Sequence, residues 1–372
     1  MPVKYDDYAY TMDRKYSIEV NTIKGELPSF ARAFLRSINT SKQIRTQLAY
    51  AYDIRVFFRF LQESKPKYKD ILMKDIPSSA MDDVTTDDAA EYLSWLGSYE
   101  HEGKEYANTN VGKKRKYAVM RSFYHYLVNG VGLATKDPFA AIDPPKVNEK
   151  EIRILDDYEK NAILAEIDRE MAAAEEEITS YEGHQIPYYV SLKPHIVKRD
   201  KAIMYLFLST GMRVSELVGI NMDDLTYQKI NGDTVARVNI TRKGGGQDHL
   251  FLSHETEAVL DDYIINSRDE FRPDENNDKA LFLSVRHRRI SVRAIESKVV
   301  GRYAAVLGDP VTNGIHPHVL RATYASNYYN YTGDIYATAS VLGHKSVETT
   351  RRHYAKATDQ QKYAMVDMKL KK

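Results

Sequence analysis

A proline-rich segment without helical periodicity constrains the fold of this chain more than any other feature. In the stretch DPFAAIDPPKVNEKEIRIL, Pro138, Pro144 and Pro145 prevent a helix from continuing, because proline fixes φ and lacks a backbone N–H. Such a segment is extended and stiff. With 372 residues, the chain is long enough for two or three domains, and we place a domain boundary near residue 146.

Apolar residues recur at helical spacing on the N-terminal side of this boundary. Two helices separated by the polar break INTSKQ are predicted first, and a third follows in VTTDDAAEYLSWL, where Thr85 or Thr86 caps its start. A fourth helix is expected over about residues 110–127. Residues 26–146 are therefore expected to form a four-helix domain, whereas the polar, aperiodic residues 1–25 are predicted to be a leader that orders only against another surface.

The C-terminal side combines long helical stretches with one short β-rich segment. DDYEKNAILAEIDREMAAAEEEI and KRDKAIMYLFLSTG predict two helices, and the irregular stretch between them predicts a loop insertion. TVARVNIT and DHLFLS alternate in polarity around the glycine-rich RKGGGQ, which predicts a β-hairpin, and the sequence after ALFLS is again helical. The expected fold is mainly α with a small β-sheet, and residues 147–372 form its mixed, mostly helical second domain.

Composition excludes several classes of protein. The chain has no cysteine, so it contains no disulfide, thiolate zinc site, iron–sulfur cluster or thiol nucleophile. Lys and Arg number 53 against 52 Asp and Glu, so a polyanionic partner must be bound by local patches. The sequence has neither an apolar run of membrane-spanning length nor a signal-peptide core, so we expect a soluble cytoplasmic protein with no membrane partner.

Charge is distributed unevenly within the first domain. Residues 31–70 carry nine basic and three acidic side chains, residues 113–121 carry five basic ones and none acidic, and residues 81–105 carry eight acidic and one basic. A basic side of this kind suits a phosphate backbone, so double-stranded DNA is the expected partner; solvated helix faces are the alternative. The candidate DNA contacts are Arg45, Arg55, Arg59, Lys113, Lys114, Arg115, Lys116 and Arg121.

Two segments of the second domain place a cation beside glycines. In LFLSTGMRVSEL, Gly211 is predicted to end a helix and Arg213 to lie between two apolar helices, where it requires an anion. The alternative is a salt bridge to Glu216. In TRKGGGQD, Lys243 falls at the tip of the predicted hairpin, where it either reaches into a site or is solvated as an ordinary turn lysine.

Two further segments bring histidine, arginine and tyrosine to helix ends. In HPHVLRATYAS, Pro317 favours the first helical turn, which puts His318 and Arg321 on one face near the positive N-terminus and predicts an anion site. In VLGHKSVETTRRHYA, His344 falls in a turn and Tyr354 toward the end of the next short helix. Taken alone, the first segment also fits an exposed helix start, and Tyr354 also fits one of 28 ordinary tyrosines.

The order of these motifs resembles that of the tyrosine recombinase (phage integrase) family. GMRVSEL, TRKGGG, an HxxR, LGHKS and a following tyrosine occur in the family's order, and the match covers the whole second domain. The first domain resembles the family's core-binding domain through ANTNVGKKRKYAVMRSFYHYL and the DPF that follows it. The resemblance implies six catalytic residues, namely Arg213, Lys243, His318, Arg321, His344 and Tyr354.

Three of the implied roles concern the scissile phosphate. The resemblance implies that Arg213 and Arg321 clamp this phosphate and that His344 hydrogen-bonds it. Two fixed guanidiniums stabilise the charge that develops on the phosphate oxygens without a metal. We expect no metal, cofactor or ATP, because a phosphotyrosyl ester conserves the energy of the broken bond.

The other three roles concern proton transfer and attack. By resemblance, Tyr354 attacks, His318 is the acid and base beside it, and Lys243 protonates the leaving 5′ oxygen. A phenol with a pKa near 10 is a poor nucleophile at neutral pH, so it needs adjacent cations and a histidine that accepts its proton. Tyr354 is the tenth residue after His344, whereas most relatives have the tyrosine ninth, where this chain has His353.

The resemblance also implies an assembly and a biological class. The expected enzyme acts as a homotetramer on paired sites in double-stranded DNA, through a 3′-phosphotyrosyl intermediate and a Holliday junction. Its layout resembles the two-domain Xer recombinases, which resolve chromosome dimers; a mobile-element integrase is the close alternative. A type IB topoisomerase and a catalytically silent DNA-binding protein are more distant alternatives. The tail ATDQQKYAMVDMKLKK either docks on a neighbouring subunit or packs on its own domain.

Overall fold

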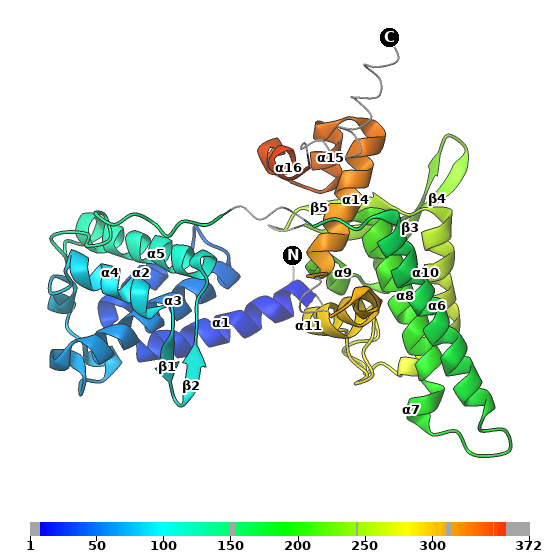
Figure 1. The fold of residues 1–372 in the computed structure, drawn as a ribbon, viewed down its shortest axis with the longest axis horizontal. Coiled ribbons are helices and arrows are strands. Elements are labelled where there is room, and N and C mark those ends of the chain that lie inside the picture. Colours follow the sequence, from blue (N-terminus) through cyan, green and yellow to red (C-terminus); the bar gives the residue numbers. More distant parts are fainter. Residues whose placement is uncertain (1–7, 149–152, 243–244, 310–313, 345, 355–372) are drawn as a thin grey trace, which may run out of the picture. The chain divides into compact units, whose positions relative to one another are not determined.

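The chain divides into two compact units in the computed structural model, unit 1 (Met1–Glu149) and unit 2 (Lys150–Lys372) (Figure 1). In both units helices dominate and the sheets are small, as the sequence predicts. The structure describes residues 8–148, 153–242, 245–309, 314–344 and 346–354.

The described part of unit 1 consists of α-helices, short helical turns and a β-hairpin. The α-helices are α1 (Tyr8–Glu26), α2 (Ser29–Ser37), α3 (Ile44–Ser64), α4 (Thr86–Trp95) and α5 (Asn110–His125). The helical turns are η1 (Pro66–Tyr68), η2 (Met73–Asp75), η3 (Ser78–Met81) and η4 (Tyr126–Gly130). The antiparallel hairpin is formed by β1 (Tyr99–His101) and β2 (Lys104–Tyr106). Helices α2 to α5 are the four helices predicted from apolar spacing.

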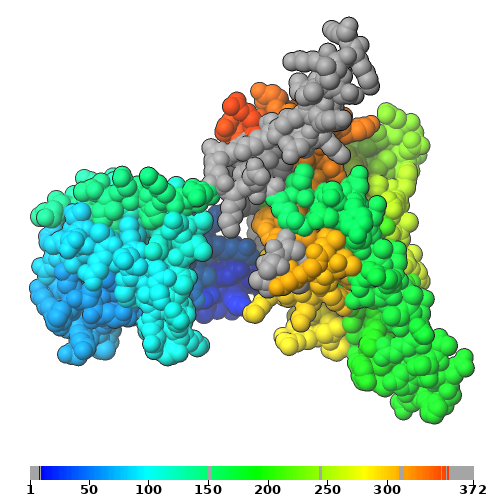
Figure 2. Space-filling view, in the orientation of Figure 1, coloured from blue at the N-terminus to red at the C-terminus, as the bar shows by residue number. Residues whose placement is uncertain are grey.

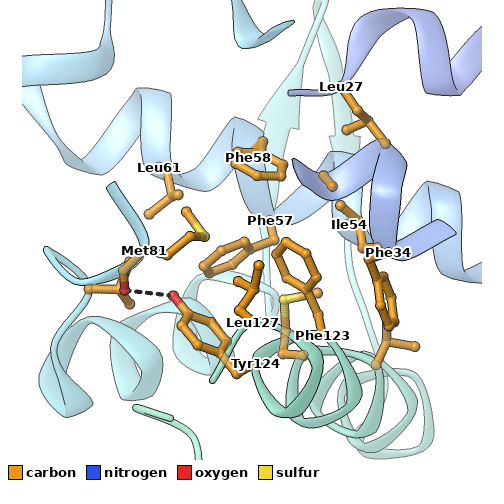
Figure 3. Packing of buried hydrophobic residues seen from close by; sticks show 14 of the residues in the cluster. Leu27, Phe34, Ile54, Phe57, Phe58, Leu61, Met81, Phe123, Tyr124 and Leu127 are labelled. Atoms are coloured by element: carbon orange, nitrogen blue, oxygen red, sulfur yellow. Dashed lines mark hydrogen bonds between the residues drawn. The ribbon is translucent and has the colours of Figure 1, made fainter. Parts of the chain in front are cut away.

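The core of unit 1 is aromatic. Phe57 and Phe58 of α3 meet Phe123 and Tyr124 of α5, and all four side chains are fully buried (Figure 3). The rings of Phe57 and Phe58 lie 5.9 Å apart in an edge-to-face arrangement, which aromatic pairs prefer. The Tyr124 hydroxyl donates a 3.3 Å hydrogen bond to the Met81 carbonyl. This packing holds together α3 and α5, the two helices that carry the predicted DNA contacts.

Helix α1 differs from the aperiodic leader expected for residues 1–25. It packs on α3, and Val20 and Ile23 are buried in the interface. Val20, Ile23 and Leu27 do follow one another at helical spacing. They form only a narrow apolar face, however, in an otherwise polar segment. An amphipathic face as narrow as this gives a weak periodic signal, which explains why the sequence analysis missed the helix.

The β1–β2 hairpin was not predicted either. Its turn places Glu102 and Gly103 at positive φ, which matches the backbone that two-residue hairpin loops require. Tyr99 stacks on Trp95 of α4 at 4.1 Å between ring centroids and on Tyr106 across the hairpin at 5.3 Å. Strands of three residues are too short for an alternating pattern to stand out in the sequence.

Helices also make up most of the described part of unit 2. The longer ones are α6 (Asp157–Thr179), α8 (Lys193–Thr210), α10 (His254–Asn266) and α14 (Pro317–Thr332). The shorter ones are α7 (Tyr188–Ser191), α9 (Val214–Gly219), α11 (Val292–Ala294), α12 (Gly301–Ala304), α15 (Ile335–Val341) and α16 (Val347–Tyr354). The remaining helical turns are η5 (Met222–Asp224), η6 (Arg268–Phe271), η7 (Ile295–Val300) and η8 (Ala305–Leu307). The stretch over residues 179–197 was predicted as a loop insertion, but α7 and the first turn of α8 lie within it. Its irregular part, the α6–α7 connection, projects from this unit (Figures 1 and 2).

The sheet of unit 2 has one strand more than predicted. Strands β3 (Leu225–Ile230), β4 (Asp233–Thr241) and β5 (Gln247–Phe251) form an antiparallel sheet in that order. The predicted hairpin is β4 and β5, and its turn is closed by the pairing of Thr241 with Gln247. Strand β3 is largely exposed and lacks the alternation that marks β4. Among helices of the described ranges, none combines the length and apolarity that a membrane span needs.

Gly211 ends α8 as predicted and fixes the approach of α14. Its φ of 60° lies in the left-handed region, where glycine carries no steric penalty. A side chain here would also overlap the ring of Tyr324 on α14. Helices α8 and α14 therefore meet closely at the point where the chain turns toward Arg213.

Candidate active site

Arg321 joins three segments that are far apart in the sequence. It lies in the first turns of α14 and is only 4% exposed. Its Nη1 donates a 2.6 Å hydrogen bond to the carbonyl of Gly211 at the end of α8, and its Nη2 donates to the carbonyl of Leu342 at the end of α15. Carbonyl groups at helix C-termini carry partial negative charge and favour a cation. The turn before Arg213 and the turn before His344 are thereby held against the same guanidinium.

Arg213 lies just before α9 and is oriented by a buried carboxylate. Its Nη1 lies 2.7 Å from Oε1 of Glu216, and its backbone N–H donates a 2.7 Å hydrogen bond to Oε2 of the same residue. The side chain of Glu216 is 2% exposed, whereas that of Arg213 is 22% exposed. The ion pair considered in the sequence analysis is therefore present, and it fixes a guanidinium that still reaches solvent.

His318 lies one helical turn before Arg321, and the charges around it act on its pKa. Burial lowers the pKa of His318 below its ordinary value, and electrostatic interaction with His316, Arg321 and Arg213 lowers it further. The rings of His316 and His318 are 5.8 Å apart, in an edge-to-face arrangement. The side chain of His318 remains accessible to solvent. At neutral pH its imidazole is neutral and able to accept a proton.

His344 occupies the turn between α15 and α16. Its backbone N–H donates a 2.9 Å hydrogen bond to the carbonyl of Ala339, and its Nδ1 shares a 2.8 Å hydrogen bond with the hydroxyl of Thr350. Thr350 is fully buried, so the contact fixes the ring against α16. The same helix ends at Tyr354, and it packs on α15 and α14.

The structure brings together the segments of four predicted catalytic residues, Arg213, His318, Arg321 and His344. Tyr354 belongs to the next helix after His344, and its side chain lies outside the described part of the structure. Lys243 lies outside the described residues altogether. Within the described ranges, no group of three or more His, Asp or Glu side chains is arranged to hold a metal ion.

Arg242 is a part of this site that the sequence analysis missed. Its Nη2 donates a 2.8 Å hydrogen bond to the carbonyl of Val341, and its Nε lies 2.9 Å from Oδ2 of Asp248. Its Nη1 lies 3.4 Å from Oε2 of Glu216, the carboxylate that also holds Arg213. The available signal was an arginine and an aspartate facing each other across the predicted hairpin turn.

In unit 1, the structure corrects the position expected for Lys116. This residue was predicted on a DNA-contacting surface, but it is 6% exposed, and its Nζ lies 2.6 Å from Oδ1 of Asp53. The Asp53 side chain is fully buried and also accepts a 2.8 Å hydrogen bond from Nη2 of Arg115. Burial raises the pKa of Asp53, while Lys116 and Arg115 oppose the rise. Lys116 therefore neutralises a buried carboxylate, whereas Lys114 and Arg115 are exposed.

Several of the other predicted DNA contacts surround a hollow of about 460 Å³. It lies between α3, α5 and the β1–β2 hairpin, with Tyr99 and Tyr106 on its wall; its arginines are Arg45, Arg55, Arg59 and Arg115. Figure 2 shows α5 and the hairpin on the surface of this unit. Burial lowers the pKa of Arg59, and the neighbouring Arg55 lowers it further. A concentration of guanidiniums with this arrangement favours an anion.

Two arginines of the hollow and one predicted contact outside it have protein partners. Arg55 pairs with Glu26 at 3.0 Å, and Arg121 pairs with Asp137 at 2.9 Å. The guanidinium of Arg45 lies 5.0 Å from the ring centroid of Tyr16, a cation–π distance. Lys113 is partly exposed, like Arg55 and Arg121, whereas Arg45 is exposed.

Comparison with known proteins agrees with this geometry. Residues 185–361 match the Phage integrase family. The tyrosine recombinase XerC of Caldanaerobacter subterraneus subsp. tengcongensis is 30% identical over 355 residues, which cover 92% of this chain and 86% of that protein.

Solved structures show the same fold. The XerH site-specific recombinase bound to its difH substrate has a TM-score of 0.57 at 17% identity, covering 87% of this chain and 80% of that one. The Tn1549 transposon integrase (aa 82–397), in complex with circular intermediate DNA, has a TM-score of 0.57 at 16% identity, covering 91% and 99%. The chain is a member of the tyrosine recombinase (phage integrase) family, and so an enzyme of site-specific DNA recombination.

Proposed function

We propose that this recombinase cleaves and rejoins duplex DNA through a 3′-phosphotyrosyl intermediate formed on Tyr354. The observation that carries the proposal is the bridging of Gly211 and Leu342 by Arg321, because it gathers the segments of Arg213 and His344 around one guanidinium.

The scissile phosphate would lie against the guanidiniums of Arg213 and Arg321, with His344 donating a hydrogen bond. Negative charge grows on the non-bridging oxygens as the phosphorus is attacked. Arg213 is held by Glu216, and Arg321 is held by two carbonyls, so both cations are positioned before the substrate arrives. Fixed charges of this kind stabilise the transition state without reorganising during the reaction.

The reaction is then a balanced exchange of two phosphate esters. The Tyr354 oxygen bonds to phosphorus, and the bond between phosphorus and the 5′ oxygen breaks. The phenol proton passes to His318, whose lowered pKa keeps the imidazole neutral and ready to accept it. The 5′ oxygen leaves with the bonding electrons and takes a proton from Lys243. In the second step a 5′-hydroxyl attacks the phosphotyrosine, and the protons move in the opposite direction.

Unit 1 would hold the DNA backbone. The exposed Lys114 and Arg115, the partly exposed Lys113, and the arginines around the hollow are the groups that we assign to phosphate contact. Lys116 does not belong to this set, because it forms a buried ion pair with Asp53.

We further propose that the active assembly is a homotetramer on two DNA sites, acting through a Holliday junction. Resolution of chromosome dimers is the biological role favoured by the similarity to XerC over most of both chains. Integration or excision of a mobile element is the second candidate, supported by the fold similarity to the Tn1549 integrase.

A plasmid assay tests the proposed reaction. A supercoiled plasmid with two directly repeated candidate sites is expected to give two smaller circles without ATP. A matched plasmid with a single site is expected to stay unrecombined. Relaxation of both plasmids without recombination would contradict the proposal and favour a topoisomerase.

A further inference from the structure

We infer that Arg242 is a positioning residue of strand cleavage. It fixes the β4–β5 turn against the end of α15 and against Glu216, and so sets the position from which the next residue in the chain, Lys243, protonates the leaving oxygen. The inference rests on the proposed role of Lys243 as general acid.

The side chain of Arg242 is bonded in three directions. Its side chain is 11% exposed. Its partners are Asp248 on β5, Glu216 on α9 and the carbonyl of Val341 at the end of α15. A surface arginine ordinarily keeps its charged head in water, whereas that of Arg242 is held by three separate elements. The strand end from which the turn begins is therefore tied to the body of unit 2.

The backbone of Arg242 closes the same turn. Its N–H donates a 2.7 Å hydrogen bond to the carbonyl of Gly246, and its carbonyl accepts a 3.0 Å hydrogen bond from the N–H of Gly245. A glycine-rich turn without a side-chain anchor would leave a catalytic group at its tip many positions to sample. Arg242 removes this freedom on one side of the turn, and a general acid gains rate when its position is fixed beforehand.

The partners of Arg242 connect it to the two other parts of the site. Glu216 is shared with Arg213, so one buried carboxylate orients both arginines. On the other side, a Cβ at Gly343 would lie 2.8 Å from Nε of Arg242, so the turn that carries His344 packs directly on the guanidinium. Only glycine permits this approach.

The positive charge of Arg242 is already paired with acidic groups of unit 2. Glu216 and Asp248 supply two carboxylates, and Val341 supplies a carbonyl, so the guanidinium is matched by anionic and acceptor groups of unit 2. A phosphate clamp needs a guanidinium with positive charge left for the substrate; Arg213 pairs with one carboxylate, whereas Arg242 pairs with two. The geometry therefore assigns Arg242 to positioning and not to phosphate binding.

A substrate with sulfur in place of the leaving 5′ oxygen separates these roles. A thiolate leaves without a proton, so a defect that acts through the general acid disappears with this substrate. We expect Arg242→Met to cleave ordinary DNA roughly 10- to 100-fold more slowly, which is part of the roughly 100- to 10,000-fold that general-acid catalysis contributes, and to cleave the sulfur substrate at nearly the wild-type rate. Arg237→Met is the matched control. Arg237 lies on β4, which ends directly before Arg242, and its guanidinium donates hydrogen bonds to Thr226 and Gln228, so its substitution is expected to change neither rate.

Two further variants make the test decisive. Arg242→Met combined with Lys243→Ala is expected to be no slower than Lys243→Ala alone, because both substitutions remove one function. Asp248→Asn removes a single partner of Arg242 and is expected to show a smaller defect with the same rescue, which keeps the test valid if Arg242→Met unfolds. Thermal unfolding and DNA affinity are measured for each variant.

The outcomes distinguish this inference from the proposed function. Equal slowing of Arg242→Met on both substrates, or independent losses in the double variant, would overturn the positioning role while Lys243→Ala is still rescued by sulfur. Failure of sulfur to rescue Lys243→Ala itself would overturn the general-acid assignment, and the positioning role would fall with it.

Discussion

The Nη1 atom of Arg321 donates a 2.6 Å hydrogen bond to the carbonyl oxygen of Gly211, although 110 residues separate them in the chain. A second arm of the same guanidinium reaches the carbonyl of Leu342. One side chain thus satisfies the ends of two helices and places the turns that follow them next to each other.

Arg321→Ala is expected to destabilise the fold as well as abolish cleavage. The substitution leaves two carbonyls without their donor, at a cost of about 1–3 kcal/mol for each one that stays buried. Urea unfolding measures the loss. Arg288→Ala is the control, since the Arg288 side chain is 75% exposed and its removal is expected to change stability by less than about 0.5 kcal/mol. Equal stability of the two variants would show that Arg321 does not hold the turns together.

Gly211→Ala is expected to be destabilising for two separable reasons. The left-handed φ alone costs about 1–2 kcal/mol for a residue with a Cβ, and the overlap with Tyr324 adds to it. The double variant with Tyr324→Ala removes most of the overlap but not the backbone penalty. A double-mutant cycle by urea unfolding is expected to give a favourable coupling between the two substitutions, and strict additivity would contradict the close approach of α8 and α14.

The pKa of His318 is expected to rise in Arg213→Gln, because the positive charge of Arg213 is one of the causes that lower it in the wild type. NMR titration of the imidazole measures the shift. An unchanged pKa would mean that the two residues are farther apart than the structure places them.

The lowered pKa of His318 also predicts how the free energy of unfolding changes with pH. The folded state binds the proton more weakly than the unfolded state, so stability falls as pH decreases from the ordinary histidine pKa near 6.5 toward the lower folded value. His318→Gln is expected to remove this part of the pH dependence in urea unfolding measured across that window. A steeper loss in the variant would contradict the sign.

Lys116→Met is expected to reduce stability, whereas Lys114→Met is expected to weaken DNA binding. Loss of Lys116 leaves the buried Asp53 carboxylate with only the half-exposed Arg115, and breaking a buried pair costs about 3–5 kcal/mol. Loss of the exposed Lys114 is expected to leave stability unchanged and to reduce the salt dependence of DNA binding by about one unit of slope. Unfolding curves and binding isotherms at several salt concentrations measure both, and equal stability of the two variants would contradict the buried pair.

Much of the fold could be predicted because local signals agreed with it. Thr85 caps α4 by accepting a hydrogen bond from the N–H of Asp88, and the Asp88 carboxylate accepts one from the N–H of Thr85, as a threonine followed by an acidic residue three positions later favours. Gly211 and Pro317 mark a helix end and a helix start where the sequence places them. The site motifs could be recognised because each combines a residue typical of a helix end or a turn with a cationic side chain.

The remaining features depend on tertiary contacts that a single sequence does not encode locally. Helical spacing puts Lys116 three residues before Val119 and seven before Phe123, on the buried face of α5, so its burial could have been predicted. Its partner could not, because Asp53 lies 63 positions away in the chain. Arg242 belongs to the site through Glu216 and Val341, which are distant in sequence. Helix α1 is stabilised by α3 and shows little amphipathic pattern of its own.

Covalent trapping on nicked suicide DNA tests the central claim most directly. Cleavage next to the nick releases a short fragment, so the protein–DNA adduct accumulates, and mass spectrometry of its peptides identifies the linked residue. We predict that the wild type carries the 3′-phosphate on Tyr354 and that Tyr354→Phe binds the same DNA without forming an adduct. An adduct on another residue, such as Tyr363, the next tyrosine in the chain, or one that persists in Tyr354→Phe, would contradict the account.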